Sequence, residues 1–214
     1  TLEHRFEIMN RYVQESVKYF GEEIACRMMR SRLCWFAKGL RNSSQYPCSS
    51  PKWAGDWITV DQLEQFLPQL AKVIEPSPHG HQYMSLNHGL HFTGGEPFLN
   101  FKLLLKAVQI AETLNIPSTF VETNCFWCKT DTLTKERLQI LKDNGLKGIM
   151  ISVNPFYAEY IPFEKTDRCI RINLEIFGEN VAVYQLAFYR QFISLGITDR
   201  LPVEEYLQLT RGNP

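Results

Sequence analysis

Long apolar runs are missing from this 214-residue sequence, and so is an excess of charge of either sign. No segment approaches the ~20 consecutive apolar residues of a membrane-spanning helix, so the pattern predicts no membrane partner. The 23 basic and 23 acidic residues cancel, which argues against attraction of the whole chain to nucleic acid. The first residues, Thr1 to Arg5, show neither a methionine nor a basic segment followed by an apolar one. We therefore expect no secretory signal and a cytoplasmic location.

The remaining composition is that of an ordinary globular protein, with 44% hydrophobic and 21% charged residues. Its length predicts one domain, or one domain with an appendage. The six cysteines come without a secretory leader, so we interpret them as reduced thiols or metal ligands rather than as a disulfide framework.

From Trp57 onward, helical patterns alternate with short apolar runs. We expect helices at residues 61–74, 98–114, 134–144 and 165–177, strands at residues 89–93, 117–122 and 148–153, and a mixed segment at residues 183–195. Strands that alternate with helices imply an α/β fold built from parallel β–α units. Ligands of such folds bind at the carboxyl ends of the strands.

Residues 1–40 have a different, purely helical pattern, with apolar residues at three- and four-residue steps. Glycines at positions 21 and 39 suggest an antiparallel helix pair. The polar stretch that follows ends in Pro47 and is the best candidate boundary in the chain. We therefore predict two domains, a helical module at residues 1–47 and an α/β domain at residues 48–214.

A basic run lies within and just after the second predicted helix. No acidic residue interrupts its five members, Arg27, Arg30, Arg32, Lys38 and Arg41. A local basic face of this kind is suited to holding phosphate.

A glycine turn follows the first predicted strand, in the segment HFTGGEPFLNF of residues 91–101. Because glycine has no side chain, its backbone can approach a ligand closely. The turn resembles the S-adenosylmethionine-binding turn of the radical S-adenosylmethionine enzymes. This resemblance implies an incomplete (β/α) barrel of that type, with S-adenosylmethionine as cofactor and its amino group at the turn. The turn residues in question are Thr93, Gly94, Gly95, Glu96 and Pro97.

Polar residues also end the next two predicted strands. The radical S-adenosylmethionine family places contacts to the ribose and carboxylate of the cofactor at such positions. The resemblance therefore implies cofactor contacts for Glu122, Asn124, Ser152 and Asn154. The alternative for any one of them is helix capping or turn formation after a strand.

The iron–sulfur cluster of that family has no evident ligands here. The family holds a four-iron, four-sulfur (4Fe-4S) cluster with thiolates spaced Cys-x3-Cys-x2-Cys, and no two cysteines of this chain are four positions apart. Cys26, Cys34 and Cys48 are separated by eight and fourteen positions, so they would hold a cluster only by converging in space. Buried packing on a helix is the alternative for the first two. We therefore expect a cofactor-binding protein that is weak or inactive as an enzyme, and the sequence names no substrate.

Cys125 and Cys128 form the one Cys-x2-Cys pair of the chain. The spacing suits metal or redox chemistry, but two thiols alone do not complete a four-ligand site. We interpret the pair as a packing or accessory feature, with Cys169 as a candidate third ligand.

The N-terminal segment carries a second resemblance. Residues 19–40, YFGEEIACRMMRSRLCWFAKGL, resemble the C-terminal helical module of bacterial tRNA-dihydrouridine synthases. This resemblance implies that the basic helix contacts tRNA, with Trp35 and Phe36 packed beneath it. The flavin barrel of that family has no counterpart here, so the alternative function is a non-enzymatic tRNA-binding module. A composite chain without a selected function is a third alternative.

Overall fold

The computed structural model describes Lys18 and residues 57–211. The predicted helix pair, apart from Lys18, lies outside these residues. So do the boundary at Pro47 and the basic residues between positions 27 and 41. An α/β unit begins at Ile58. Among the described helices, none combines the length and the apolar character that a bilayer crossing requires.

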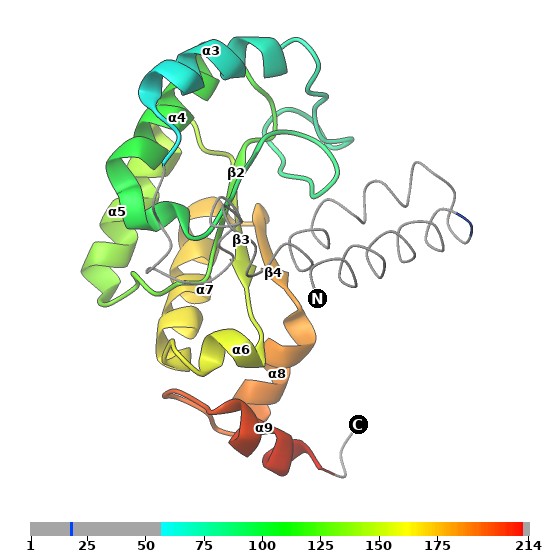
Figure 1. Ribbon diagram of the computed structural model, residues 1–214, viewed down its shortest axis with the longest axis vertical. Coiled ribbons are helices and arrows are strands. Elements are labelled where there is room, and N and C mark those ends of the chain that lie inside the picture. Colours follow the sequence, from blue (N-terminus) through cyan, green and yellow to red (C-terminus); the bar gives the residue numbers. More distant parts are fainter. Residues whose placement is uncertain (1–17, 19–56, 212–214) are drawn as a thin grey trace, which may run out of the picture. The chain divides into compact units, whose positions relative to one another are not determined.

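A four-stranded sheet forms the centre of this unit (Figure 1). Its strands are β1 (His91–Phe92), β2 (Phe120–Thr123), β3 (Gly148–Ser152) and β4 (Val181–Tyr184). They lie side by side in chain order, and each neighbouring pair is parallel. The prediction of an α/β fold with parallel β–α units is therefore confirmed.

Helices connect the strands close to the predicted positions. The described helices are α3 (Val60–Leu70), α4 (Phe101–Thr113), α5 (Asp131–Asp143), α6 (Pro155–Ala158), α7 (Phe163–Phe177), α8 (Leu186–Ser194) and α9 (Val203–Thr210), with the 3-10 helix η3 (Pro97–Asn100) before α4. The mixed segment resolves into β4 and α8, separated by Gln185 in a left-handed conformation. Helices α6 and α9 were not predicted; both are short, and each follows or includes a proline.

The two faces of the sheet differ in chemistry, because side chains alternate along each strand. One face includes Val121, Ile149 and Ile151, which are fully buried in the main core with side chains of α4, α5 and α7 (Figure 1). The other face carries aromatic, polar and charged side chains along three neighbouring strands. These are His91, Phe120, Glu122, Met150 and Ser152.

A second, smaller core joins α3 to α4. Leu63 and Leu67 of α3 are buried against Ala107 and Ala111 of α4. Their spacing of four residues places each pair on one face of its helix, so burial of this face explains why α3 docks there.

The backbone before β1 depends on Gly89. Its φ angle is +80°, and a Cβ atom at this position would lie 2.2 Å from the carbonyl oxygen of Ser118. Only glycine fits both the backbone conformation and this close approach, so Gly89 fixes how the chain enters the sheet.

Candidate functional site

The glycine turn lies at the carboxyl end of β1, with open space beside it. Gly94 and Gly95 have φ angles of +101° and +68°, in the region that glycine adopts without strain. Thr93 and Gly94 are exposed, and a Cβ atom on Gly94 would meet no other atom within 4 Å. A ligand can therefore reach the backbone of this turn.

Glu96 points inward from the same turn and holds it against the end of β2. Its side chain is only 5% exposed. The carboxyl group accepts hydrogen bonds from the Thr123 hydroxyl at 3.0 Å, from the Asn124 backbone N–H at 2.8 Å and from the Phe98 backbone N–H at 3.2 Å. Because Glu96 is buried beneath the turn, it supports the site rather than facing a ligand.

Burial raises the pKa of Glu96 to about 7, although its three donors act in the opposite direction. The hydrogen bonds favour the carboxylate, but removal of the group from water favours the neutral acid more strongly. Glu96 therefore changes its charge near neutral pH.

Glu122 is the centre of a polar network at the carboxyl edge of the sheet. It accepts hydrogen bonds from the Thr93 hydroxyl at 3.0 Å and from the Ser152 hydroxyl. The Nε2 atom of His91 lies 3.5 Å from Oε2 of Glu122. This nitrogen is buried and makes no regular hydrogen bond. The structure thus brings together three predicted cofactor contacts, Thr93, Glu122 and Ser152, and adds His91 to them.

The charge of Glu122 is set by two opposing effects. Burial acts to raise its pKa, but the neighbouring His91 and the hydroxyls of Ser152 and Thr93 outweigh it, so the pKa of Glu122 lies below its ordinary value. At neutral pH this edge of the sheet therefore presents a carboxylate.

The side chains of the two predicted asparagine contacts, Asn124 and Asn154, form hydrogen bonds with the nearby backbone. The side-chain oxygen of Asn154 accepts the Tyr157 backbone N–H at 3.0 Å and caps α6. The side-chain oxygen of Asn124 accepts the Phe126 backbone N–H at 3.1 Å. These are the capping and turn interactions that the sequence analysis gave as the alternative, and they leave the amide nitrogens of both side chains for other contacts.

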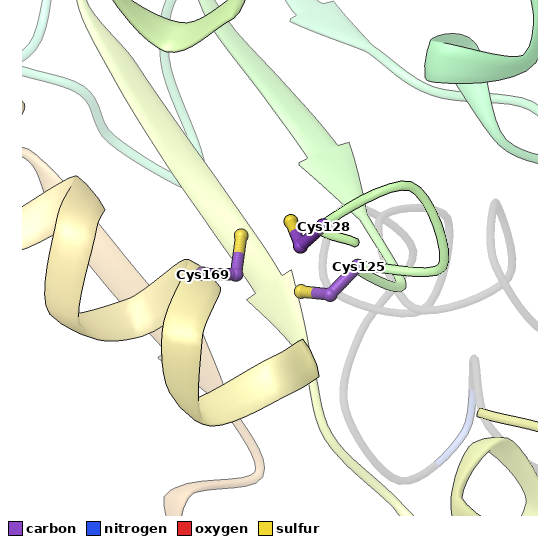
Figure 2. Close-up of side chains that lie close together, drawn as sticks. All are labelled: Cys125, Cys128 and Cys169. Carbon is purple, nitrogen blue, oxygen red and sulfur yellow. The ribbon is translucent and has the colours of Figure 1, made fainter. Parts of the chain in front are cut away.

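A group of three thiols lies next to this edge, where the loop after β2 meets α7. We call residues 124–130 the cysteine loop. It contributes Cys125 and Cys128, and Cys169 of α7 faces them (Figure 2). The three sulfur atoms all lie within 4.8 Å of one another, and none of the three residues has any exposed surface.

The three thiols differ in the direction in which their pKa is shifted. Burial raises the pKa of Cys125 and of Cys169 well above the ordinary value. Burial also acts to raise the pKa of Cys128, but hydrogen bonds from the other two thiols, together with nearby Arg168, lower it to about 5. Cys128 therefore has the lowest pKa of the three thiols.

Some candidate residues fall outside the described part of the chain. They are Cys26, Cys34 and Cys48, together with the basic residues between positions 27 and 41. Their predicted roles stay predictions.

His91 was not among the predicted site residues. In an extended strand, residues two apart lie on the same face, so its position two residues before Thr93 could have indicated it.

No protein-family model matches this sequence, and no curated protein matches it either. The chemistry of the site therefore has to be argued from its geometry.

Proposed function

We propose that this protein binds S-adenosylmethionine at the carboxyl edge of its sheet, between the glycine turn and Glu122. The observation that carries the proposal is the pairing of an accessible positive-φ glycine turn with a carboxylate held by hydroxyls from both neighbouring strand ends. The resemblance of residues 91–101 to the cofactor-binding turn of the radical S-adenosylmethionine enzymes supports it.

The chemistry of the ligand matches these groups. S-adenosylmethionine has an ammonium group and a sulfonium centre, both cationic, and a ribose with two hydroxyls. Backbone carbonyls of the glycine turn would accept the ammonium protons, and Glu122 would accept ribose hydroxyls while its charge attracts the sulfonium. His91 lies beside Glu122, with its Nε2 atom 3.5 Å from Oε2, and helps to keep this group a carboxylate.

Calorimetric titration of the purified chain with S-adenosylmethionine tests the proposal. We expect one binding site, and we expect the Glu122→Gln variant to bind about 10- to 100-fold more weakly, because a hydrogen bond to a charged group contributes about 1.5–3 kcal/mol. Glu112→Gln is the matched control, because Glu112 lies on α4, is partly exposed and pairs with Lys147, away from the proposed site. S-adenosylhomocysteine, which lacks the sulfonium charge, should bind more weakly than S-adenosylmethionine. An absence of binding, or equal losses in both variants, would refute the proposal.

We further propose that the bound cofactor is not cleaved reductively. The sequence has no thiolate set with the spacing that the radical S-adenosylmethionine enzymes use, so we derive no step through an iron–sulfur cluster. Anaerobic reconstitution with iron and sulfide, followed by dithionite, should yield no 5′-deoxyadenosine. Incorporation of about four irons per chain together with 5′-deoxyadenosine would contradict this expectation.

A second proposal concerns the basic run, which no acidic residue interrupts between Arg27 and Arg41. We propose that it binds tRNA through phosphate contacts. Binding should weaken as salt is added and should be lost when Arg27, Arg30 and Arg32 are replaced by alanine. Salt-independent binding, or binding that survives the triple substitution, would contradict it.

A further inference from the structure

We propose that Cys125, Cys128 and Cys169 form a binding site for one thiophilic d10 cation of the zinc class, separate from the proposed S-adenosylmethionine site. The three sulfur atoms come from two segments more than forty residues apart and point toward one another (Figure 2). Zinc is bound by thiolates, and three protein ligands with water in the fourth position is an established arrangement for this ion.

The spacing of the sulfurs fits a single ion. Zn–S bonds of about 2.3 Å in a tetrahedral site place two sulfurs about 3.8 Å apart. The three sulfurs here lie within 4.8 Å of one another, so a small inward shift of each side chain completes the geometry. Thiolates that hold an iron–sulfur cubane each bind a different iron and are held farther apart. The geometry therefore points to one metal ion rather than to the cluster of the radical S-adenosylmethionine enzymes.

The cysteine loop, which carries Cys125 and Cys128, is held in place by contacts that involve no metal. Trp127 stacks on Phe98 with ring centroids 4.0 Å apart, and its indole N–H donates to the Thr123 hydroxyl at 2.9 Å. The same hydroxyl accepts the Cys125 backbone N–H at 3.1 Å. Because these contacts order the loop without a metal, binding an ion costs little additional conformational entropy.

Helix α7 supplies charge compensation as well as the third thiol. One face of the helix presents Lys165, Arg168 and Cys169, at the spacing of one helical turn. The Nζ atom of Lys165 donates to the Phe126 carbonyl at 3.3 Å, and the Arg168 guanidinium donates to the Cys128 carbonyl at 2.8 Å. One divalent cation on three thiolates leaves a net charge of −1, which the Lys165 ammonium offsets. Arg168 also pairs with Asp131 at 2.9 Å, so its part is to hold the Cys128 carbonyl in place.

Asn173 provides an outer contact of the kind that metal ligands commonly have. It is fully buried, and its amide nitrogen donates to the Cys169 sulfur at 3.2 Å and to the Cys169 carbonyl at 2.8 Å. The hydrogen bond to the sulfur favours the thiolate form of Cys169 and fixes the orientation of its side chain. Loading the site with zinc forms three Zn–S bonds, and each thiol that still carries a proton releases it to water.

The test uses the full chain with Cys26, Cys34 and Cys48 replaced by serine, so that the proposed ligands are the remaining thiols. The chain is purified with a reductant, stripped with a chelator and titrated with zinc against a chromophoric chelator. We expect one zinc per chain, and we expect zinc to protect three thiols from modification. Cobalt in place of zinc should give thiolate-to-metal charge-transfer bands. None of these readouts depends on S-adenosylmethionine, so the two proposals can fail separately.

Variants of the site then identify the ligands. Cys169→Ala should weaken zinc binding by more than ~100-fold, and Asn173→Leu by about 10- to 100-fold, which is the usual cost of losing an outer contact. If Cys169→Ala does not fold, the cobalt spectrum of the chain with all three ligands still reports the number of bound thiolates. The proposal is overturned if no zinc binds, if Cys125 and Cys128 are joined as a disulfide under reducing purification, or if zinc is lost when Cys26, Cys34 and Cys48 are replaced.

Discussion

At the scale of single residues, two glutamates with the same ordinary pKa are driven in opposite directions. Glu96 is buried below the glycine turn, and its pKa rises to about 7. Glu122 lies 26 positions later at the edge of the sheet, and its pKa falls because hydroxyls and His91 face it. The first glutamate therefore supports the turn, and the second supplies the negative charge of the site.

The raised pKa of Glu96 makes stability depend on pH. Between pH 4.5 and 7 the folded chain binds more protons at this residue than the unfolded chain does, so the free energy of unfolding falls as the pH rises. A shift of this size corresponds to a loss of about 3 kcal/mol across the window. Glu96→Gln removes the titrating group, so the pH profile of its unfolding free energy should be flatter by this amount.

Urea unfolding of the wild type and of Glu96→Gln at several pH values measures this difference. Parallel profiles for the two proteins would show that Glu96 does not titrate in this range in the folded state. A wild-type profile that rises through the window relative to the variant would contradict the assigned direction.

At the scale of elements, the sequence predicted the order of strands and helices well because apolar periodicity is a local property. The boundaries were less accurate where a polar cap decides them. We expected a helix from residue 134, but Thr130 accepts the Leu133 backbone N–H and starts α5 at Asp131. Similarly, the Asn100 side chain accepts the Leu103 backbone N–H and separates η3 from α4.

The connection into β1 offers a test of how tightly these elements are packed. Gly89→Ala would place a methyl group 2.2 Å from the Ser118 carbonyl oxygen at a φ of +80°. We expect a loss of about 2–5 kcal/mol in the free energy of unfolding, from backbone strain together with overpacking.

Gly196→Ala is the matched control, because Gly196 also has a positive φ, +68°, but a Cβ atom there meets nothing within 4 Å. The control should lose only the about 1–2 kcal/mol of a left-handed alanine. Equal losses in thermal or urea unfolding of the two variants would contradict the close approach at Gly89.

At the scale of the whole molecule, part of the candidate site followed from the sequence and part did not. Parallel strands in chain order bring their carboxyl ends to one edge, so the meeting of Thr93, Glu122 and Ser152 could be predicted. Cys169 was a candidate third ligand for Cys125 and Cys128, but no spacing rule supported it, because their meeting depends on how α7 is rotated against the cysteine loop. Tertiary packing of this kind leaves no periodic signal in the sequence.

We propose that the carboxyl edge of the sheet binds S-adenosylmethionine, and a backbone amide NMR titration of the full chain tests this binding directly. We predict that S-adenosylmethionine shifts the amides of residues 93–97, 122–124 and 152–154, while amides at the opposite end of the strands stay unchanged. Saturating ligand that leaves these three segments unshifted, or that shifts a different surface, would contradict the account.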